Sequence, residues 1–247
     1  MPTVPGLVWP GDADDNGTVN MVDLLSIGLK YGTTGSHRDS ISITFNGKNA
    51  QSWSGKLPNN TNDKNIDCNG NGTINVIDTT AISRNFNLTH PNSNVSFKTT
   101  GQASVTLNKL GNSQCNPPKP DCTAVTWDMI LNNPQSLYGI SLFFNYSEDV
   151  TINSTKLTSS CLGKEGVDFI NMIKNDSTNN QLNIGLTRIK PSQGDVPCSS
   201  IGNITMEVME FDGDIDELLT LNVEETTNIM SLLQGTNITF LEVSISK

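Results

Sequence analysis

The chain has 247 residues, of which 35% are hydrophobic, so it is long enough for one sizeable core or for two modest domains. Its formal net charge of −10 argues against a nucleic-acid partner, because contacts with phosphates need clustered lysine and arginine side chains. The sequence holds no apolar stretch long enough to cross a bilayer, and residues 1–5 lack the charged and apolar regions of a signal peptide.

After an N-terminal arm, residues 1–10, two stretches of twelve residues carry the same oxygen-bearing side chains in the same order, 55 residues apart. A calcium ion takes about six to eight oxygen ligands, and a loop of this length supplies them from side chains at positions 1, 3, 5, 9 and 12 and from the carbonyl at position 7. Gly17 and Gly72 stand at position 6, where the chain must turn sharply. The predicted calcium ligands are Asp12, Asp14, Asn16, Thr18, Asn20 and Asp23 in the first loop, and Asp67, Asn69, Asn71, Thr73, Asn75 and Asp78 in the second.

The duplication favours calcium sites over a simpler alternative. A single stretch of this kind is also compatible with a surface turn in which Asn and Asp side chains bond their own backbone. Here both copies run into an apolar stretch with helical periodicity, and the offset aligns Met21 with Val76 and Ile27 with Ile82. The sequence therefore predicts two calcium ions, each bound by a loop that a helix follows.

The two loop–helix units, residues 11–32 and 66–87, resemble the type I dockerin module, because each carries the pattern D-x-[DN]-x-N-G-x-[VI]-N-x-x-D. The resemblance implies a small calcium-dependent domain whose two units pack about a pseudo-twofold axis and bind a cohesin partner through one helix face. Residues 8–90 also resemble a dockerin-like region of secreted proteins from Bacteroidetes-type bacteria. We therefore expect a dockerin-like domain over residues 11–93, with a longer spacer than dockerins usually have.

That spacer, residues 33–64, is expected to be ordered. Ile41, Ile43 and Phe45 alternate with polar residues, which is the period of a half-buried strand, and a tight turn at Asn46-Gly47 would follow. The pattern predicts a small inserted hairpin. Trp53 would pack beside this hairpin or, alternatively, stack on a sugar ring, and the high average burial of tryptophan favours packing.

From about residue 94 the sequence changes to short alternating apolar segments that Asn, Gly, Pro and Ser interrupt. About nine strands at this spacing predict an all-β sandwich over residues 94–247, and hence an α+β multidomain fold for the whole chain. The expected strands are residues 95–99, 103–107, 125–131, 138–146, 167–173, 181–188, 201–208, 218–223 and 238–245.

Two of these segments are similar to strands of a cohesin-type, Ig-like sandwich. They are LYGISLFFNY, from Leu137 to Tyr146, and LNIGLTR, from Leu182 to Arg188. In cohesins, a strand of the form Y-G-[IL]-x-[FL] lies near the middle of the sandwich. The resemblance implies a cohesin-like body behind the dockerin-like head.

Five cysteines occur, and none has the spacing or the histidine neighbours of a zinc site. A Cys115–Cys122 bond would close a short loop, and a Cys161–Cys198 bond would tie two segments of the sandwich domain, although four cysteines allow three connectivities. Cys68, inside the second loop, would then be a buried free thiol or would bond to a neighbouring chain.

Motifs of known enzymes do not occur in the sequence. The two histidines, His37 and His90, stand in no recognisable triad context, and there is no G-x-S-x-G or phosphate-binding loop. An acidic segment could supply paired carboxylates or a third cation site, but it lacks the glycine at position 6, so we expect a solvated turn. Its members are Asp212, Asp214, Asp216 and Glu217. We therefore predict a protein that is not an enzyme.

The surface is expected to carry glycans, although a chain rich in Asn, Ser and Thr also produces sequons by chance. The candidate N-glycosylation sites are Asn59, Asn87, Asn94, Asn145, Asn153, Asn175, Asn203 and Asn237. Ser40, Thr79 and Ser177 stand in Asp-Ser/Thr motifs that resemble the O-glycosylation signal of Bacteroidetes-type bacteria.

A dockerin-like head and a cohesin-like body in one chain predict head-to-tail self-association, whose default product is an open filament. The leading hypothesis is therefore an extracellular or cell-surface structural subunit that binds other copies of itself. A strand donated to a neighbour by the arm, residues 4–9, or by residues 238–245 is another linkage. The alternatives are an adaptor for a separate cohesin-bearing protein and a carbohydrate-binding module, whose aromatic candidates are Trp53, Trp127 and Tyr138.

Overall fold

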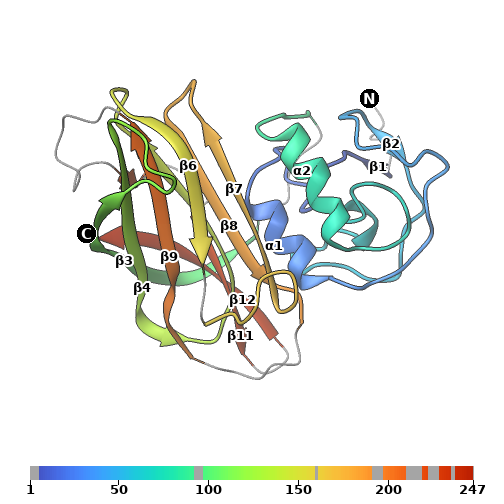
Figure 1. The fold of residues 1–247 in the computed structure, drawn as a ribbon. Coiled ribbons are helices and arrows are strands. Elements are labelled where there is room, and N and C mark those ends of the chain that lie inside the picture. The colour runs from blue at the N-terminus through green and yellow to red at the C-terminus, as the bar shows by residue number, and fades with distance from the viewer. Residues whose placement is uncertain are drawn as a thin grey trace.

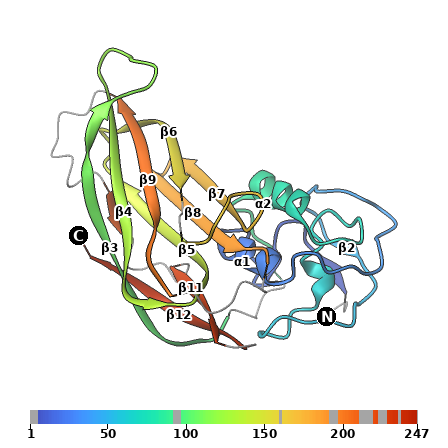
Figure 2. The ribbon, with the colours of Figure 1, turned by 60° about the horizontal axis from the view of Figure 1, so that its bottom comes forward.

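The computed structural model describes residues 6–91, 97–158, 161–190, 197–209, 219–221, 228–234 and 237–246. Its N-terminal part is a small head of loops and short helices, and its C-terminal part is a β-sandwich (Figure 1). The head lies against one side of the sandwich, and helix α1 is the element of the head nearest to the strands, as the turned view also shows (Figure 2). Among the described helices, none has the length and apolar composition to span a membrane.

Each loop of the head leads into a short helix, as predicted. Helix α1 (Val22–Leu29) follows the first loop, and every residue from Val22 to Gly28 is buried. A helix buried on all sides must be covered by more than one element. In the second unit, the 3₁₀ helix η2 (Val76–Asp78) continues into α2 (Thr79–Asn85), and only one side of α2 is buried. The two repeated helices therefore have different environments.

The predicted hairpin in the spacer is wrong. Residues 41–45 form no strand, and Ile41 is exposed. The only strand that the structure describes within residues 33–64 is β2 (Lys48–Asn49), which pairs with β1 (Leu7–Val8) of the N-terminal arm. A 3₁₀ helix, η1 (Asp63–Asn65), ends the spacer.

The spacer instead uses its polar groups to hold the second loop–helix unit. The Ser42 N–H donates to Asn69 O over 3.1 Å, and Ile43 O accepts the side-chain amide of Asn85 over 2.8 Å. In a hairpin, a partner strand would form hydrogen bonds with the backbone of residues 41–45. Here the second loop and α2 form such bonds, so these residues form no hairpin. Trp53 is half-buried in the same region, and its Nε1 donates to Ser36 O.

The strands of the C-terminal part form a ten-stranded sheet with the order β6-β9-β4-β3-β12-β11-β5-β8-β7, in which β10 pairs with β5. The described pairs are antiparallel except β12 with β3. The sheet folds over, so that buried residues such as Val125 and Ile204 share one core with Leu142 and Ile184 (Figure 1). The strands are β3 (Thr99–Gln114), β4 (Cys122–Gln135), β5 (Leu137–Tyr146), β6 (Thr151–Thr158), β7 (Phe169–Asp176), β8 (Gln181–Arg188), β9 (Cys198–Met209), β10 (Leu219–Leu221), β11 (Ile229–Gln234) and β12 (Asn237–Ser246).

The predicted β-sandwich is confirmed, but two of its strands were not predicted. Strand β6 is polar along most of its length, and β11 is apolar at successive positions, since it lies between β5 and β12. Neither strand therefore shows the alternation by which a half-buried strand is recognised. The predicted strand 95–99 is not seen, since residues 95 and 96 lie outside the described ranges and β3 begins at Thr99.

Candidate metal centre

The two twelve-residue loops form the same hydrogen bonds. In each, the carboxylate at position 1 accepts the N–H groups of positions 5 and 6, and the carboxylate at position 12 accepts those of positions 3 and 9. The amide oxygen at position 9, on Asn20 and Asn75, accepts the N–H two residues further on, where the helical region begins. The repeated sequence thus produces two loops with equivalent positions for the side chains that were predicted to bind calcium.

Three carboxylates meet in the first loop. One oxygen from each of Asp12, Asp14 and Asp23 lies within 4.8 Å of the other two, and all three side chains are buried. Negative charges this close repel one another, and burial deprives them of water. A hard divalent cation that prefers oxygen ligands would remove both penalties, so the donor set fits calcium.

Burial and repulsion raise the pKa values of this loop. The pKa of Asp14 lies well above its ordinary range, first because the group is buried and then because Asp23 and Asp12 oppose its ionisation. Burial followed by the charge of Asp12 raises the pKa of Asp23 in the same way. At position 4, burial is also the main cause that raises the pKa of Asp15 to about 6. A bound cation would return these groups to their charged forms.

The second loop contains fewer acidic residues than the first, and a positively charged side chain lies beside it. Asn69 takes the place of an acid at position 3, and burial raises the pKa of Asp67 and, to about 7, that of Asp78. Arg38, from the spacer, partly opposes both shifts through its positive charge. The contact of Arg38 with this loop could not be predicted from sequence, because no local pattern connects residue 38 to the loop.

His90 braces the first loop. Its Nε2 lies 2.6 Å from Asp12 Oδ2, its backbone N–H donates to Gly17 O, and its ring stacks on Trp9 with centroids 4.5 Å apart. The sequence offered His90 only as a potential base outside any motif, since nothing local links it to Asp12. The other histidine, His37, is exposed.

Helix α1 connects the first loop to the sandwich. It packs on a surface formed by β5, β7 and β8, which we call the seat. A Cβ at Gly28 would collide with Thr187 Oγ1 of β8, and a Cβ at Gly139 of β5 would come within 2.8 Å of Leu25. The hydroxyl of Tyr138 donates to Gly28 O over 3.1 Å. The helix backbone therefore touches the sheet, and glycine at position 28 makes this approach possible.

The equivalent face of the second unit is open. At the repeat offset, Met21 and Val22 of the first unit correspond to Val76 and Ile77. Met21 and Val22 are buried, whereas Val76 and Ile77 are 49% and 54% exposed. The apolar residues at the start of the helical region are therefore covered in the first unit and exposed in the second.

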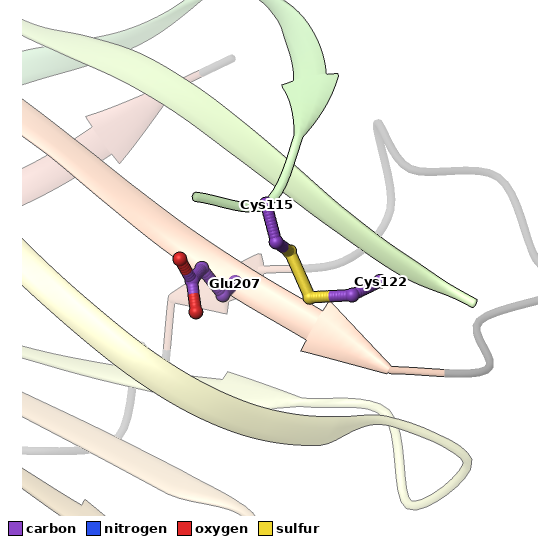
Figure 3. A group of neighbouring side chains, drawn as sticks. All are labelled: Cys115, Cys122 and Glu207. Atoms are coloured by element: carbon purple, nitrogen blue, oxygen red, sulfur yellow. A yellow bond between two sulfur atoms is a disulfide. The ribbon is translucent and has the colours of Figure 1, made fainter. Parts of the chain in front are cut away.

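Both predicted disulfides are confirmed. Cys115–Cys122 joins the segment after β3 to the start of β4, beside Glu207 of β9 (Figure 3). Because each of these sulfurs is bonded to the other, the group offers no thiolate to a metal. Cys161–Cys198 ties the segment after β6 to β9. Cys68 is a buried free thiol, so the alternative of a bond to a neighbouring chain does not fit this structure.

The remaining candidate residues differ in their exposure. Trp127 and Tyr138 are buried, which excludes them from a solvent-facing platform for sugars. The acidic segment 212–217 and Asn94 lie outside the described residues. Of the glycosylation candidates, the exposed ones are Ser40, Asn87, Asn153, Asn175, Ser177 and Asn237, and the half-buried ones are Asn59, Thr79, Asn145 and Asn203.

The raised pKa values predict that the metal-free head loses stability as pH rises. A carboxyl whose pKa is higher in the folded than in the unfolded state binds more protons when folded, so raising the pH favours unfolding. For Asp78 this window runs from the ordinary value of 3.8 to about 7, and Asp14 and Asp23 act in the same direction. In chelator, the melting temperature of the head should fall between pH 5 and pH 7.5; a rise would contradict the shifts.

Comparisons with known proteins give structural neighbours only. No family model matches the chain, and no curated protein does. The structural neighbours include a type II cohesin from Bacteroides cellulosolvens, at 12% identity over 57% of this chain and 99% of the cohesin, with a TM-score of 0.39. A type II cohesin module from the ScaA scaffoldin of Acetivibrio cellulolyticus matches at 12% identity over 59% and 93%, with a TM-score of 0.37. A type I cohesin–dockerin complex from Clostridium thermocellum matches at 10% identity over 62% and 94%, with a TM-score of 0.36.

Proposed function

We propose that this protein is an extracellular, calcium-binding structural subunit without catalytic activity, and that it assembles with other copies of itself. Its head would be a dockerin-like module in which the two loops bind calcium and so fix the position of α1. The buried carboxylates of the first loop support this reading, because they need a cation to offset their charge. The two disulfides support an oxidising location outside the cytosol.

The contact between α1 and its seat carries the assembly proposal. Both halves of this contact belong to one chain, so the head of one copy could occupy the seat of the next with the same contacts. Exchange of an identical element is a low-cost route to oligomers, because it requires no new surface. Since head and seat are different surfaces, repeated exchange gives an open filament unless the rotation closes a ring.

A disulfide that holds the head on its own seat tests this exchange. A Cβ at Gly185 of β8 would lie 3.5 Å from the Cβ of Met21, within the range of disulfide-bonded cysteines. We expect oxidised Met21→Cys/Gly185→Cys to stay monomeric at calcium and protein concentrations at which the wild-type chain forms filaments in electron micrographs. Reduction of the bond should restore assembly, and each single variant serves as a control.

Two outcomes would contradict the proposal. A wild-type protein that remains monomeric in calcium at all concentrations tested would exclude self-assembly. Filaments that persist in the oxidised double variant would exclude exchange of the head and would require a different contact surface.

The open face of the second unit favours a second candidate, an adaptor that binds a separate cohesin-bearing protein. Exposed neighbouring apolar side chains such as Val76 and Ile77 are typical of docking surfaces. This candidate predicts a discrete complex with a cohesin module that Ile77→Asp abolishes, with no self-association of the wild-type chain. A complex that survives Ile77→Asp would rule out this face.

A further inference from the structure

The two loops differ in charge although their hydrogen bonds repeat. The first places three carboxylates among its ligand positions, on Asp12, Asp14 and Asp23, and a fourth acid, Asp15, occupies position 4. The second has only Asp67 and Asp78. Because the affinity of such loops rises with the number of charged ligands, the first loop should bind calcium more tightly on this count alone.

The guanidinium group of Arg38 increases the difference in charge between the two loops. Arg38 is 4% exposed, its Nη2 donates to Cys68 O over 2.7 Å, and its backbone N–H donates to Gly70 O. Its Nε and Nη1 have no hydrogen-bond partner among the described residues, while its charge interacts with Asp67 and Asp78. A cation in this place repels a metal ion and supplies part of the charge that the metal would otherwise supply.

Position 4 of each loop shows that the difference is built into the fold. In the second loop this position is Gly70, and a Cβ there would lie within 2.7 Å of Arg38 Cζ, so glycine makes room for the guanidinium. In the first loop the same position is Asp15, whose φ of 58° is also in the left-handed region. At this turn, the second loop therefore leaves room for the Arg38 guanidinium, whereas the first loop carries an additional acid, Asp15.

The spacer also holds the shape of the second loop through its backbone. The Gly35 N–H donates to Gly72 O over 3.0 Å, and the Ser42 N–H donates to Asn69 O over 3.1 Å. Together with the bonds from Arg38, these contacts fix four carbonyls of the loop without a metal. The first loop is also held by protein groups, since Gly17 O accepts the His90 N–H and Asp14 O accepts the Thr61 hydroxyl, so the expected difference between the loops rests on their charge.

We infer that the two loops are unequal calcium sites: the first binds tightly and depends on the ion for its structure, whereas the Arg38 guanidinium makes the second a weak site that is folded without calcium. This inference rests on the proposed function, because it assumes that calcium is the ion. It implies that, at low calcium concentration, only the first loop is filled, which is the loop that positions α1 on its seat.

Calorimetric titration of the decalcified full chain with calcium tests the inference. We expect two binding steps whose dissociation constants differ by about tenfold or more. Asp23→Asn should remove the tight step, and Asp78→Asn should remove the weak one. Arg38→Met removes the charge but keeps an apolar stem. This variant should lower the dissociation constant of the weak step by about tenfold and leave that of the tight step within about twofold. The matched control is Arg84→Met, at an exposed arginine of α2, which should change neither step.

The outcomes separate the inference from the proposed function. Equal affinities in the wild-type chain, or a second step that Arg38→Met leaves unchanged, would overturn the inference and leave the calcium proposal standing. Failure of both loops to bind would overturn the calcium proposal itself. If Arg38→Met does not fold, the wild-type titration and the two loop variants still decide, and Arg38→Lys should keep the weak step weak.

Discussion

Replacement of Asp23 by alanine is expected to lower the melting temperature of the head while that of the sandwich stays unchanged. The buried Asp23 carboxylate accepts N–H groups from Ala13 over 2.6 Å, Asp14 over 3.1 Å and Asn20 over 2.7 Å, and it is also a proposed calcium ligand. Hydrogen bonds to a charged group contribute about 1.5–3 kcal/mol each, so their loss should destabilise the head by about 4 kcal/mol or more. Thermal unfolding in calcium should then show an early transition for the head.

The comparison variant is Asp39→Ala, which removes an exposed acid from the same head and should leave the melting curve unchanged. Chelator added to the wild-type chain should reproduce the Asp23→Ala curve. An Asp23→Ala protein that binds calcium with unchanged affinity and melts like the wild type would show that Asp23 is not a ligand.

Leucine at position 28 is expected to displace the head from the sandwich. The Cβ atom alone would collide with Thr187. It would also lie 2.6 Å from Arg188 O, which is a backbone atom and so cannot move aside by a side-chain rotation. Overpacking of this kind commonly destabilises a protein by about 1–3 kcal/mol. Because the collision includes a backbone atom, the effect of Gly28→Leu should lie at or above the upper end of this range. Small-angle scattering should show a larger radius of gyration at unchanged molecular mass.

The internal repeat provides the control for this variant. Ser83 occupies the position of the second unit that corresponds to Gly28, and it is half-buried in α2, a helix of which only one side is buried. Ser83→Leu should therefore leave the dimensions of the molecule unchanged. Equal effects of the two substitutions would mean that the seat does not hold the head in solution.

The loops and their helices could be predicted from sequence, because each is encoded by a short contiguous pattern. A twelve-residue loop contains its own candidate ligands, its glycine and the residues that begin the helix, and here it occurs twice. The sandwich was recognised for a similar reason, since strands such as β8 are short alternating apolar segments between turn residues. The disulfides were named as one of several possible pairings.

Contacts between distant segments could not be predicted. The alternation of Ile41, Ile43 and Phe45 indicated a hairpin, but the backbone there bonds to the second loop and to α2, whose positions a local pattern does not contain. The same limit applies to Arg38, to His90 and to the seat of α1 on β8. Each depends on the spatial arrangement of two parts of the chain that lie far apart in sequence.

Titration of the decalcified protein with calcium, followed by amide hydrogen exchange of the same samples, is the most direct test of whether the metal shapes the head. We expect heat of binding and slower exchange for residues 12–29 on addition of calcium, with little change in the strands of the sandwich. If no heat is released and exchange at residues 12–29 is the same with and without calcium, the carboxylates of the first loop do not form a calcium site.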